Sequence, residues 1–587
     1  MNAYETIIKT LQDLAGDTRE GVTFSLAETE DSAHGDYATN IAFPLSKKHG
    51  VSPKDYAESI RAELENSLAS VVQKVEVAGP GFINFFLKDE AIRHENEKGD
   101  VQIVTKYTGK NVLVEHSSPN LFKPFSVGHL MNNIIGEFIT RAMSTSGAHV
   151  KTMSFPSDVS LGIAKALMMV ERDISEEKIA LNYFSNESED TVIQYLGDTY
   201  VRGVKECEEN EVSLEEAKKV LDKMYHLKDD DFYTLVAKTR EINEKYFKKT
   251  LHAIGSDIDG FVYEGQAGKE GERIVRENIG EGKVFTESEG AVVYIPNESR
   301  KDLHTAVFIN SQGYPTYEAK DIGLMEIKFK PLLSAIGIDN FFPEYSFFVT
   351  DIEQMSHFKI VLDAASKLGD EWKERVEKSH HVPHGRMLFK GAKMSSRLGG
   401  VPLALDVISS VEEEVRERAG EKIVHLGNKE KEKLTREIAL SALRIAVLRS
   451  KPGININFDP ETSLSFEGDS GPYLLYTHAR CSSLLEKGNK GNNDTPKWSD
   501  IPVTTLERKL IHFENELTHA CNELAPQKLT TYLFSIAQLF NSYYASTQII
   551  VEGDEVGNAH RLMIVKRTKA VLKKGLYVLG IEAPERM

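Results

Sequence analysis

The stretch VLVEHSSPNLFKPFSVGHLMNNIIG, residues Val112–Gly136, decides the fold of this 587-residue chain. Its short apolar run predicts a buried strand over Val112–His116. A loop rich in serine, asparagine and proline follows, and Gly128 and His129 stand where an amphipathic helix begins. A helix N-terminus offers unpaired N–H groups and a positive dipole end, and a glycine there lets a ligand approach the backbone. The pattern is therefore typical of a strand–loop–helix unit that binds phosphate.

A second stretch, GAKMSSRLGG at Gly391–Gly400, complements the first. Its glycines flank a short loop of cations and hydroxyls, namely Lys393, Ser395, Ser396 and Arg397. Such a loop can fold over a polyphosphate and neutralise the charge that builds as a phosphate leaves. Taken alone, the same residues are typical of a solvated surface loop. The two stretches together, in this order, favour a nucleotide site.

Length and composition predict a soluble protein of several domains. Hydrophobic residues make up 41% of the chain, which is enough for real cores, and we find no apolar run near the roughly 20 residues that span a membrane. The N-terminus has an amphipathic pattern with acids rather than a secretory signal. Cys207, Cys481 and Cys521 are too scattered for a disulfide framework or a zinc cluster, so we expect a cytoplasmic protein without a structural metal.

The net charge of -18 argues against indiscriminate binding of nucleic acid. Affinity follows local patches, however, and basic residues gather near the C-terminus at Lys566, Arg567, Lys569, Lys573 and Lys574. Without further context this cluster is an ordinary solvated helix face.

The hydrophobic patterns predict a multidomain α/β and α protein. We expect an α+β module over residues 1–88, a polar linker over 89–107, and the first half of a parallel doubly wound sheet over 108–165. A mainly helical insertion covers 166–265. The second half of the sheet, over 266–365, has strand patterns at Ala291–Ile295, Thr305–Ile309 and Tyr345–Thr350. Residues 366–410 carry the cationic loop, and 411–587 are helical apart from breaks such as the low-complexity Lys487–Lys497.

These stretches also resemble known signatures. S-V-G-H and K-M-S-S-R, in this order, resemble the HIGH and KMSKS motifs of class I aminoacyl-tRNA synthetases. The lead-in S-S-P-N is similar to the arginyl-tRNA synthetase version of the first motif, and HTAVFINSQGYPTYEAKDIGL (His304–Leu324) resembles that family's substrate pocket. Further similar segments are FVTDIEQMSHFKIV, EGDSGPYLLYTHARCSSLL, HGDYATN, AGPGFINFF and the terminal GIEAPERM. The resemblance covers nearly the whole chain and is weakest in the insertion and at 487–502.

The resemblance implies a split Rossmann-type catalytic domain between an N-terminal tRNA-binding domain and an all-α anticodon-binding domain. It implies ATP-dependent attachment of L-arginine to tRNA(Arg) through an arginyl-adenylate, with release of AMP and pyrophosphate. The implied partners are tRNA(Arg), L-arginine and ATP, with Mg²⁺ accompanying ATP and without a membrane. Family habit suggests a monomer, and adenylate formation that requires bound tRNA.

The resemblance also assigns site residues. A guanidinium needs planar carboxylate or amide partners, and Tyr317 and Asp321 lie four apart on an expected helix, hence on one face. Glu115 ends an apolar strand, where an acid points into the ligand crevice of an open α/β sheet. Glu115 and Asn120 are expected to hold either the guanidinium or the α-amino group. The full arginine-binding set is Glu115, Ser117, Asn120, Tyr317, Asp321 and Gln354.

Two further sets follow from the same matching. The ATP-binding set is Lys123, Ser126, Gly128, His129, Lys393, Ser395 and Ser396, with His129, Lys393 and Arg397 as catalytic residues. The tRNA-binding set is Phe82 and Asn84 for a D-loop base, and Tyr473, Tyr476, Arg480, Phe540, Tyr544 and Met587 for the anticodon. Packing in a hydrophobic core is the alternative interpretation of those aromatic residues.

Two positions depart from the signatures. Ser126 replaces the first histidine of HIGH, and Ser396 replaces the second lysine of KMSKS. Either Arg397 or Lys123 is expected to supply the missing charge. Two alternatives stay open on the sequence, namely a related class I synthetase for cysteine, glutamate or glutamine, and a tRNA-binding paralogue that has lost catalysis.

Overall fold

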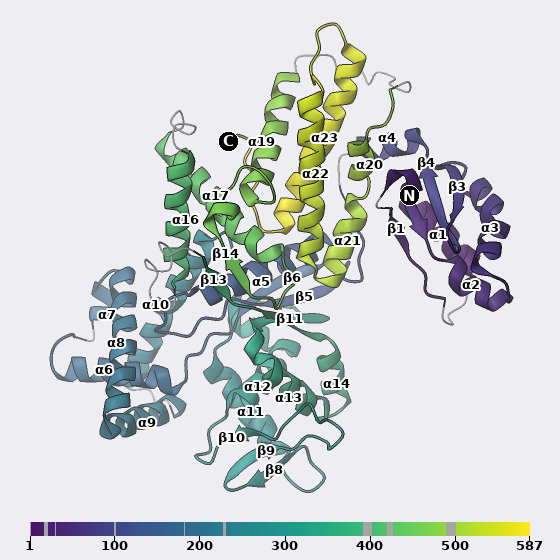
Figure 1. The fold of residues 1–587 in the computed structure, drawn as a ribbon. Coiled ribbons are helices and arrows are strands. Elements are labelled where there is room, and N and C mark those ends of the chain that lie inside the picture. The colour runs from purple at the N-terminus through teal and green to yellow at the C-terminus, as the bar shows by residue number, and fades with distance from the viewer. Residues whose placement is uncertain are drawn as a thin grey trace.

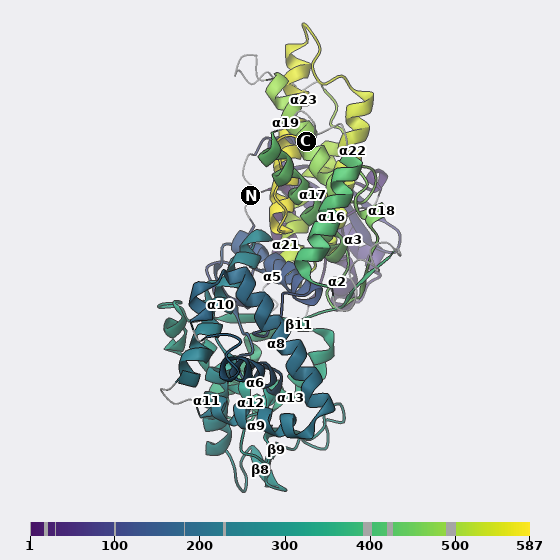
Figure 2. The same cartoon turned by 90° about the vertical axis from the view of Figure 1, so that its left-hand side faces the viewer.

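The computed structural model describes residues 2–16, 22–29, 31–98, 101, 103–180, 182–226, 231–390, 402–419, 427–488 and 501–587. A small N-terminal domain stands to one side, a catalytic region with a central sheet lies below, and long helices rise above it (Figure 1). The view turned by 90° keeps this order, with α5 (Val127–Thr145) at the junction of the lower and upper parts (Figure 2).

The N-terminal domain is a four-stranded antiparallel sheet in the order β1-β2-β4-β3, packed against helices. Its first helix begins with a capping box in which Asn2 and Glu5 satisfy each other's backbone N–H groups. Between β3 and β4 the expected Gly-Pro-Gly turn is present, with positive φ at both glycines, Gly79 and Gly81. The elements are α1 (Ala3–Ala15), β1 (Leu26–Glu28), η1 (Ser32–His34), β2 (Tyr37–Thr39), α2 (Ala42–His49), α3 (Pro53–Ser67), β3 (Val72–Ala78) and β4 (Phe82–Leu87).

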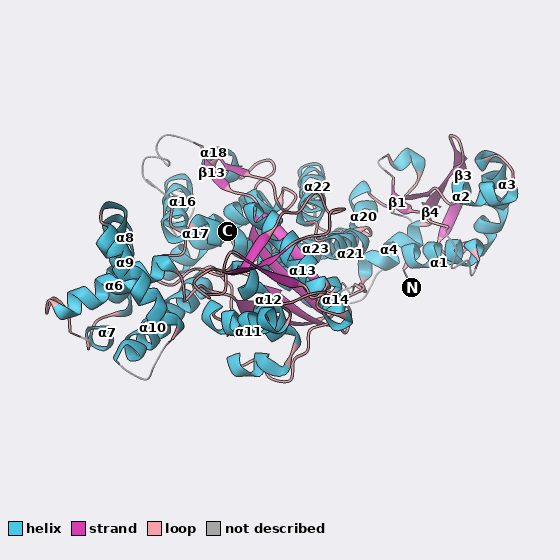
Figure 3. Ribbon diagram, turned by 90° about the horizontal axis from the view of Figure 1, so that it is seen from below, coloured by secondary structure: helices cyan, strands magenta, loops and turns pink. Residues whose placement is uncertain are grey.

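Five parallel strands form the central sheet, in the order β12-β11-β5-β6-β7. They are β5 (Asn111–Glu115), β6 (His149–Ser154), β7 (Gly260–Phe261), β11 (Tyr345–Asp351) and β12 (Ser379–His384). The strand β5 is central and fully buried over Val112–Val114, which agrees with its unbroken apolar run. Seen from below, the strands lie together among the surrounding helices (Figure 3). The expected split doubly wound sheet is therefore present.

The insertion between β6 and β7 is helical, and it has its own hydrophobic core. Its helices are α6 (Leu161–Ser175), α7 (Tyr183–Asn186), α8 (Glu189–Glu209), α9 (Glu211–Tyr225) and α10 (Asp231–Ala253). Among them α8 and α10 supply side chains that reach the loop between β5 and α5, as described below.

The second half of the catalytic region corrects the predicted strand arrangement. The patterns at 291–295 and 305–309 do form strands, but these pair in a separate antiparallel sheet of order β10-β9-β8 and not in the parallel sheet. The parallel sheet instead includes β12, and also β7, which falls inside the range expected for the helical insertion; we expected neither strand. The elements here are α11 (Glu264–Glu277), β8 (Phe285–Ser288), β9 (Ala291–Tyr294), β10 (Ala306–Ile309), α12 (Tyr317–Phe329), η2 (Pro331–Ile336), η3 (Ile352–Gln354), α13 (Met355–Ser366) and α14 (Asp370–Glu377).

Two segments differ in detail from their predicted character. The expected linker contains a helix, α4 (Asp89–Glu97), whose buried Asn96 donates to the Glu507 carbonyl of the helical domain. The expected all-helical part contains a strand, β14 (Ile456–Phe458), which pairs in parallel with β13 (Met387–Phe389).

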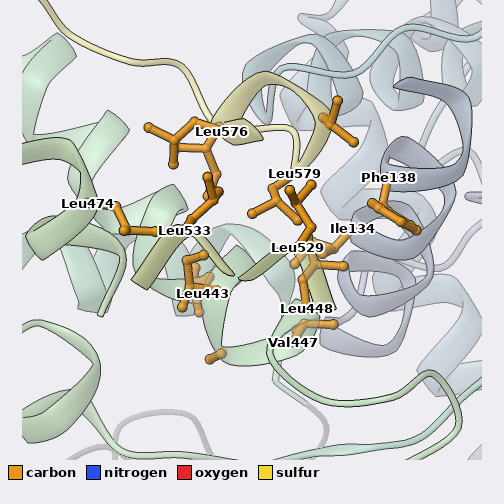
Figure 4. Packing of buried hydrophobic residues seen from close by; sticks show 14 of the residues in the cluster. Ile134, Phe138, Leu443, Val447, Leu448, Leu474, Leu529, Leu533, Leu576 and Leu579 are labelled. Carbon is orange, nitrogen blue, oxygen red and sulfur yellow. The ribbon is translucent and has the colours of Figure 1, made fainter. Parts of the chain in front are cut away.

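The helical domain shares one hydrophobic core with the catalytic region. Ile134 and Phe138 of α5 lie among leucines of the helical domain (Figure 4). None of the helices that the structure describes is long and apolar enough to cross a membrane. The helices are α16 (Ala404–Ala419), α17 (Asn428–Leu448), α18 (Pro460–Ser463), α19 (Gly471–Gly488), α20 (Thr505–Leu510), α21 (Phe513–Glu523), α22 (Pro526–Ser546) and α23 (Glu555–Val578).

Candidate active site

A cavity of about 580 Å³ opens at the carboxyl ends of the parallel strands. It lies where β5 and β11 pair, with Phe348 opposite Glu115, and the chain order reverses between these two strands. Ligands of open α/β sheets bind at such a switch point. The lining residues are Glu115, Ser118, Asn120, Ser126, Gly128, His129, Asn132, Phe155, Glu264, Tyr317, Lys320, Asp321, Val349, Thr350, Asp351, Glu353, Gln354, His357, Phe358 and His384.

Glu115 ends β5 on the floor of this cavity, and it is buried. Its carboxylate forms an ion pair with the ammonium of Lys328 from α12. Lys328 is itself buried, and its ammonium lies 5.1 Å from the centre of the Phe348 ring. Burial raises the pKa of the Glu115 carboxyl, and the nearby Lys328 opposes that rise. The floor of the cavity therefore holds a buried acid, Glu115, whose ionised form is stabilised by one neighbouring cation, Lys328.

Asp321 and Tyr317 project from α12 into the cavity, four residues apart as expected. The Asp321 carboxylate accepts a hydrogen bond of 2.5 Å from Nε2 of His357 on α13. The other ring nitrogen of His357 lies 3.5 Å from Glu318. Burial alone would lower the pKa of His357, but the two carboxylates raise it to about 10. His357 is therefore an imidazolium inside the cavity at neutral pH.

A third acid that lines the cavity is also paired with a cation. Glu264 pairs with Lys320 at 2.7 Å, and it also accepts a hydrogen bond from Ser157. Each of these three acids of the cavity wall thus has a resident cation within the fold, as buried charges require. The pairs are Glu115 with Lys328, Glu264 with Lys320, and Asp321 with His357.

The N-terminus of α5 forms the opposite wall. Ser126 is its N-cap residue, and the backbone N–H of Ser126 donates to Nδ1 of His129 at 3.0 Å. Because Nδ1 is an acceptor, the proton of the neutral ring lies on Nε2. Burial, helped by His384 and Lys123, lowers the pKa of His129 to about 4. His129 is therefore a neutral hydrogen-bond donor at a helix N-terminus.

The structure corrects the expected place of Ser117. This residue is fully buried with a φ of 57°, and its hydroxyl accepts a hydrogen bond from Asn133 at 3.1 Å. Among the described residues Ser118 lines the cavity and Ser117 does not. Lys123 does not line it either, and its ammonium lies 4.8 Å from the ring centre of Tyr200 in the insertion.

Lys393, Ser395, Ser396 and Arg397 lie outside the described residues. The chain that follows them is tied to the start of α5. The Val127 N–H donates to the Pro402 carbonyl at 2.9 Å, and the Ala404 N–H donates to the Phe125 carbonyl at 2.8 Å. The described chain at Pro402–Ala404 therefore lies beside the start of α5.

The expected tRNA contacts in the N-terminal domain differ in exposure. Phe82 and Asn84 both lie on β4. Phe82 is 44% exposed and its ring centre lies 5.0 Å from that of Phe43. Asn84 is only 5% exposed, so its side chain offers little surface to a base.

The expected contacts in the helical domain form a partly exposed cluster. The Arg480 guanidinium lies between two rings, 4.7 Å from the centre of Tyr476 and 4.8 Å from that of Tyr544. Phe540 is a correction, because it is fully buried in the core and cannot contact RNA there. Tyr473 and Met587 are half-buried against the same core.

Several cavity residues escaped the sequence analysis. Ser118 stands beside a predicted residue, and Lys320 precedes Asp321, so proximity to a motif was the available signal for both. His357 follows Gln354 by three residues at the start of α13, which is a similar hint. His384 ends the unexpected strand β12, and only the sheet reveals it.

Comparison with known proteins agrees with this architecture along the whole chain. The sequence profile described as "Arginyl tRNA synthetase N terminal domain" matches residues 2–87. The profile "tRNA synthetases class I (R), catalytic domain" matches residues 92–459, and "DALR anticodon binding domain" matches residues 474–587. The catalytic profile alone spans more than half of the chain.

Individual relatives point the same way. The chain is 28% identical to the arginine–tRNA ligase of Exiguobacterium sibiricum over 100% of both chains. It is 29% identical to that of Thermococcus sibiricus, over 99% of this chain and 98% of the relative. Among solved structures, arginyl-tRNA synthetase from Thermus thermophilus gives a TM-score of 0.77 at 25% identity, covering 99% of both chains. The Plasmodium falciparum enzyme shares the fold, with a TM-score of 0.75 at 20% identity over 100% of this chain and 98% of that one. The chain therefore belongs to the arginyl-tRNA synthetases of class I, the enzymes that attach arginine to tRNA for translation.

Proposed function

We propose that this cavity holds arginine and ATP side by side, with arginine on the β5 and α12 wall and ATP at the α5 N-terminus. The observation that carries the proposal is the charge pattern of one cavity, in which paired carboxylates face a helix N-terminus with a neutral histidine. Carboxylates suit a guanidinium, and the helix N-terminus suits phosphate.

Six side chains would bind arginine. Tyr317 and Gln354 are exposed at the mouth of the cavity, whereas Glu115 is buried in its floor. The Asp321 carboxylate would receive the guanidinium next to His357, and Asn120 would hold either the guanidinium or the α-amino group. Ser118 takes the place that we expected for Ser117, because it is the serine of this loop that lines the cavity.

ATP would lie across Ser126, Gly128 and His129. A neutral His129 donates through Nε2, so it orients a phosphate or ribose oxygen without adding charge. The charge would come from Lys393, with Ser395 and Ser396 donating hydrogen bonds. Arg397 remains our candidate for the missing KMSKS lysine, because Lys123 is placed over Tyr200.

The reaction is a nucleophilic displacement followed by an acyl transfer. A carboxylate oxygen of arginine attacks the α-phosphorus of ATP, and the bond to the bridging oxygen breaks, releasing pyrophosphate. A hydroxyl of the 3′-terminal ribose of tRNA then attacks the arginyl carbonyl, and AMP leaves. The protein contributes by positioning the reactants and stabilising phosphate charge.

The partners outside the cavity follow the same family pattern. Phe82 on β4 and the cluster of Tyr476, Arg480 and Tyr544 would stack on unpaired bases of tRNA(Arg). Mg²⁺ would enter with ATP, because it is usually bound through substrate phosphates and one or two carboxylates. We expect the enzyme to act as a cytoplasmic monomer, which gel filtration at several protein concentrations would test.

Charging assays test the proposal. Wild-type protein is incubated with ATP, each amino acid and total tRNA, and only arginine is expected to become linked to tRNA. Asp321→Asn should raise the KM for arginine by about thirtyfold or more, because removing one partner of a largely buried charge pair costs about 2–5 kcal/mol. Glu318→Gln is the matched control, since it contacts the same His357 without lining the cavity. Equal KM values for both variants would refute the assignment of Asp321.

A further inference from the structure

Two non-glycine residues of the loop between β5 and α5 have a left-handed backbone. The φ angles are 57° at Ser117 and 64° at Phe122. Residues with a side chain keep this conformation only where the surroundings enforce it. At each residue the backbone N–H donates to a buried asparagine, from Ser117 to Asn132 at 2.7 Å and from Phe122 to Asn243 at 3.1 Å. Asn132 belongs to the cavity wall, but Asn243 comes from α10 of the insertion.

Asn243 is built to present its carbonyl oxygen to the loop. It is 1% exposed, and its amide nitrogen donates to the Thr239 carbonyl one turn earlier in α10, at 2.7 Å. This bond fixes the orientation of the carboxamide, so Oδ1 faces Phe122. Loss of the acceptor would leave the buried Phe122 N–H without its partner.

The side chains of the same loop segment are also held by the insertion. Leu121 and Phe122 are 1% and 3% exposed and belong to the hydrophobic core of α6 to α10. The next residue, Lys123, lies over the Tyr200 ring of α8. Three consecutive loop residues thus rest on a domain that lies outside the sheet.

The position of this segment matters for the cavity. Ser118 and Asn120 line the cavity just before it, and Ser126 and His129 line it just after. Residues 121–123 therefore set the separation between the wall proposed for arginine and the wall proposed for ATP. A displacement of about 1 Å between reacting groups can cost a hundredfold in rate.

We propose that Asn243 is a positioning residue for adenylate formation, and that the insertion serves the reaction by fixing the loop through it. The inference rests on the function proposed above for the cavity. Asn243 does not line the cavity, so it would act through Phe122.

Arginine-dependent exchange of pyrophosphate into ATP, measured with tRNA present, tests this role. Asn243→Leu keeps the volume and removes the acceptor, and Asn243→Asp keeps an acceptor oxygen. Val192→Ala is the matched control, because Val192 of α8 is buried in the same core and is not one of the residues described above as holding the loop. Melting curves identify variants that are folded at the assay temperature. If Asn243→Leu does not fold, Asn243→Ser replaces it, since its hydroxyl is too short to reach Phe122.

We expect Asn243→Leu to lower kcat by about tenfold or more, with the KM for tRNA unchanged, and Asn243→Asp to recover most of the loss. Val192→Ala should lower the Tm while kcat stays within about twofold of wild type. An active wild type with an equally active Asn243→Leu would overturn this inference alone, and so would a kcat loss in Val192→Ala as large as in Asn243→Leu. A wild type without arginine-dependent exchange would overturn the proposed function as well.

Discussion

Replacement of Lys328 by methionine isolates the charge of Glu115 on the floor of the cavity. The two side chains are 7% and 8% exposed and form an ion pair. Methionine keeps an unbranched apolar chain of similar length, so packing against Phe348 is largely retained. The substitution removes the ammonium and little else.

The size of the effect follows from the two states that are open to Glu115. An ionised carboxylate left without its buried partner costs about 3–5 kcal/mol. Protonation is the alternative, and for an acid with an ordinary pKa of 4.5 it costs about 3.4 kcal/mol at pH 7, at about 1.36 kcal/mol per pH unit. The cheaper state is populated, so we expect Lys328→Met to lose no more than about 3.4 kcal/mol of stability at pH 7.

The loss should depend on pH with a known sign. In the variant, burial raises the pKa of Glu115 in the folded state above its unfolded value. The folded state then holds a proton that the unfolded state releases, and the variant gains stability relative to wild type as the pH falls. At pH 5 the expected loss shrinks to about 0.7 kcal/mol.

Urea unfolding at both pH values measures this difference for the transition that includes the catalytic domain. Lys330→Met is the control, because Lys330 is 47% exposed and its partner Glu326 keeps a second cation, Arg375. We expect the control to lose less than about 1 kcal/mol. Arginine should stabilise Lys328→Met more than wild type, since one of its positive groups, the guanidinium or the α-amino group, would replace the missing charge beside Glu115. A loss that is the same at pH 5 and pH 7 would refute the reasoning, because it would arise from packing rather than from the Glu115 charge.

Three further predictions concern other parts of the molecule. The pKa of His357 is raised from 6.5 to about 10, so its contribution to stability is complete below pH 6.5 and is lost as the pH rises toward 10. Wild type should therefore lose Tm over that range more steeply than His357→Gln, and parallel curves would contradict the ion pair. Arg480→Ala should weaken tRNA binding about tenfold, the scale of one lost stacking contact, without changing the KM for arginine. The control is Arg586→Ala, whose arginine is 76% exposed in the same domain, and an equal effect of both would count against the cluster. Ser256→Ala removes a hydroxyl that donates to Glu137 at 2.6 Å and accepts from Asn133 at 2.9 Å. The free energy of unfolding should fall by about 1.5–3 kcal/mol in urea, the usual contribution of a hydrogen bond to a charged group. The control is Ser441→Ala, whose hydroxyl donates to the Ile438 carbonyl of its own helix. A loss no larger than that of the control would contradict the network around Ser256.

Local patterns predicted the elements that carry the site. The unit from β5 to α5 follows from an apolar run, turn residues and a helical period, all within one segment. The helix α12 follows likewise, and with it the shared face of Tyr317 and Asp321. These signals need no partner from elsewhere in the chain.

The pairing of strands that lie far apart in the chain could not be predicted from local sequence patterns. The runs AVVYI and TAVFI predict strands, but nothing within them says that they pair with each other rather than with the parallel sheet. The strand β12 reads SHHVPH, and its histidines and Pro383 give no strand signal. Proline is tolerated there because β12 is an edge strand.

Burial decided the remaining differences. Phe540 and Tyr544 lie one turn apart on α22, yet Phe540 is fully buried and Tyr544 is 39% exposed. Ser117 and Ser118 differ in the same way, since the hydroxyl of Ser117 turns inward to Asn133 and Ser118 faces the cavity. The sequence identifies such neighbouring residues as candidate contact residues. Only the structure shows which side chain is buried in the core and which is accessible to a ligand.

Three acids that line the cavity are each paired with a cation of the protein itself, namely Lys328, Lys320 and His357. A site for a guanidinium must keep its carboxylates ionised while it is empty, and burial works against that. Lys328 and Lys320 solve the problem for Glu115 and Glu264 with buried ion pairs. His357 solves it for Asp321 with a group that can give up its proton. In the arginine site that we propose, a guanidinium at Asp321 would bring a second positive charge next to His357 and would lower the pKa of that ring from about 10. Of the three cations, His357 is therefore the one that we expect to lose its proton as arginine enters.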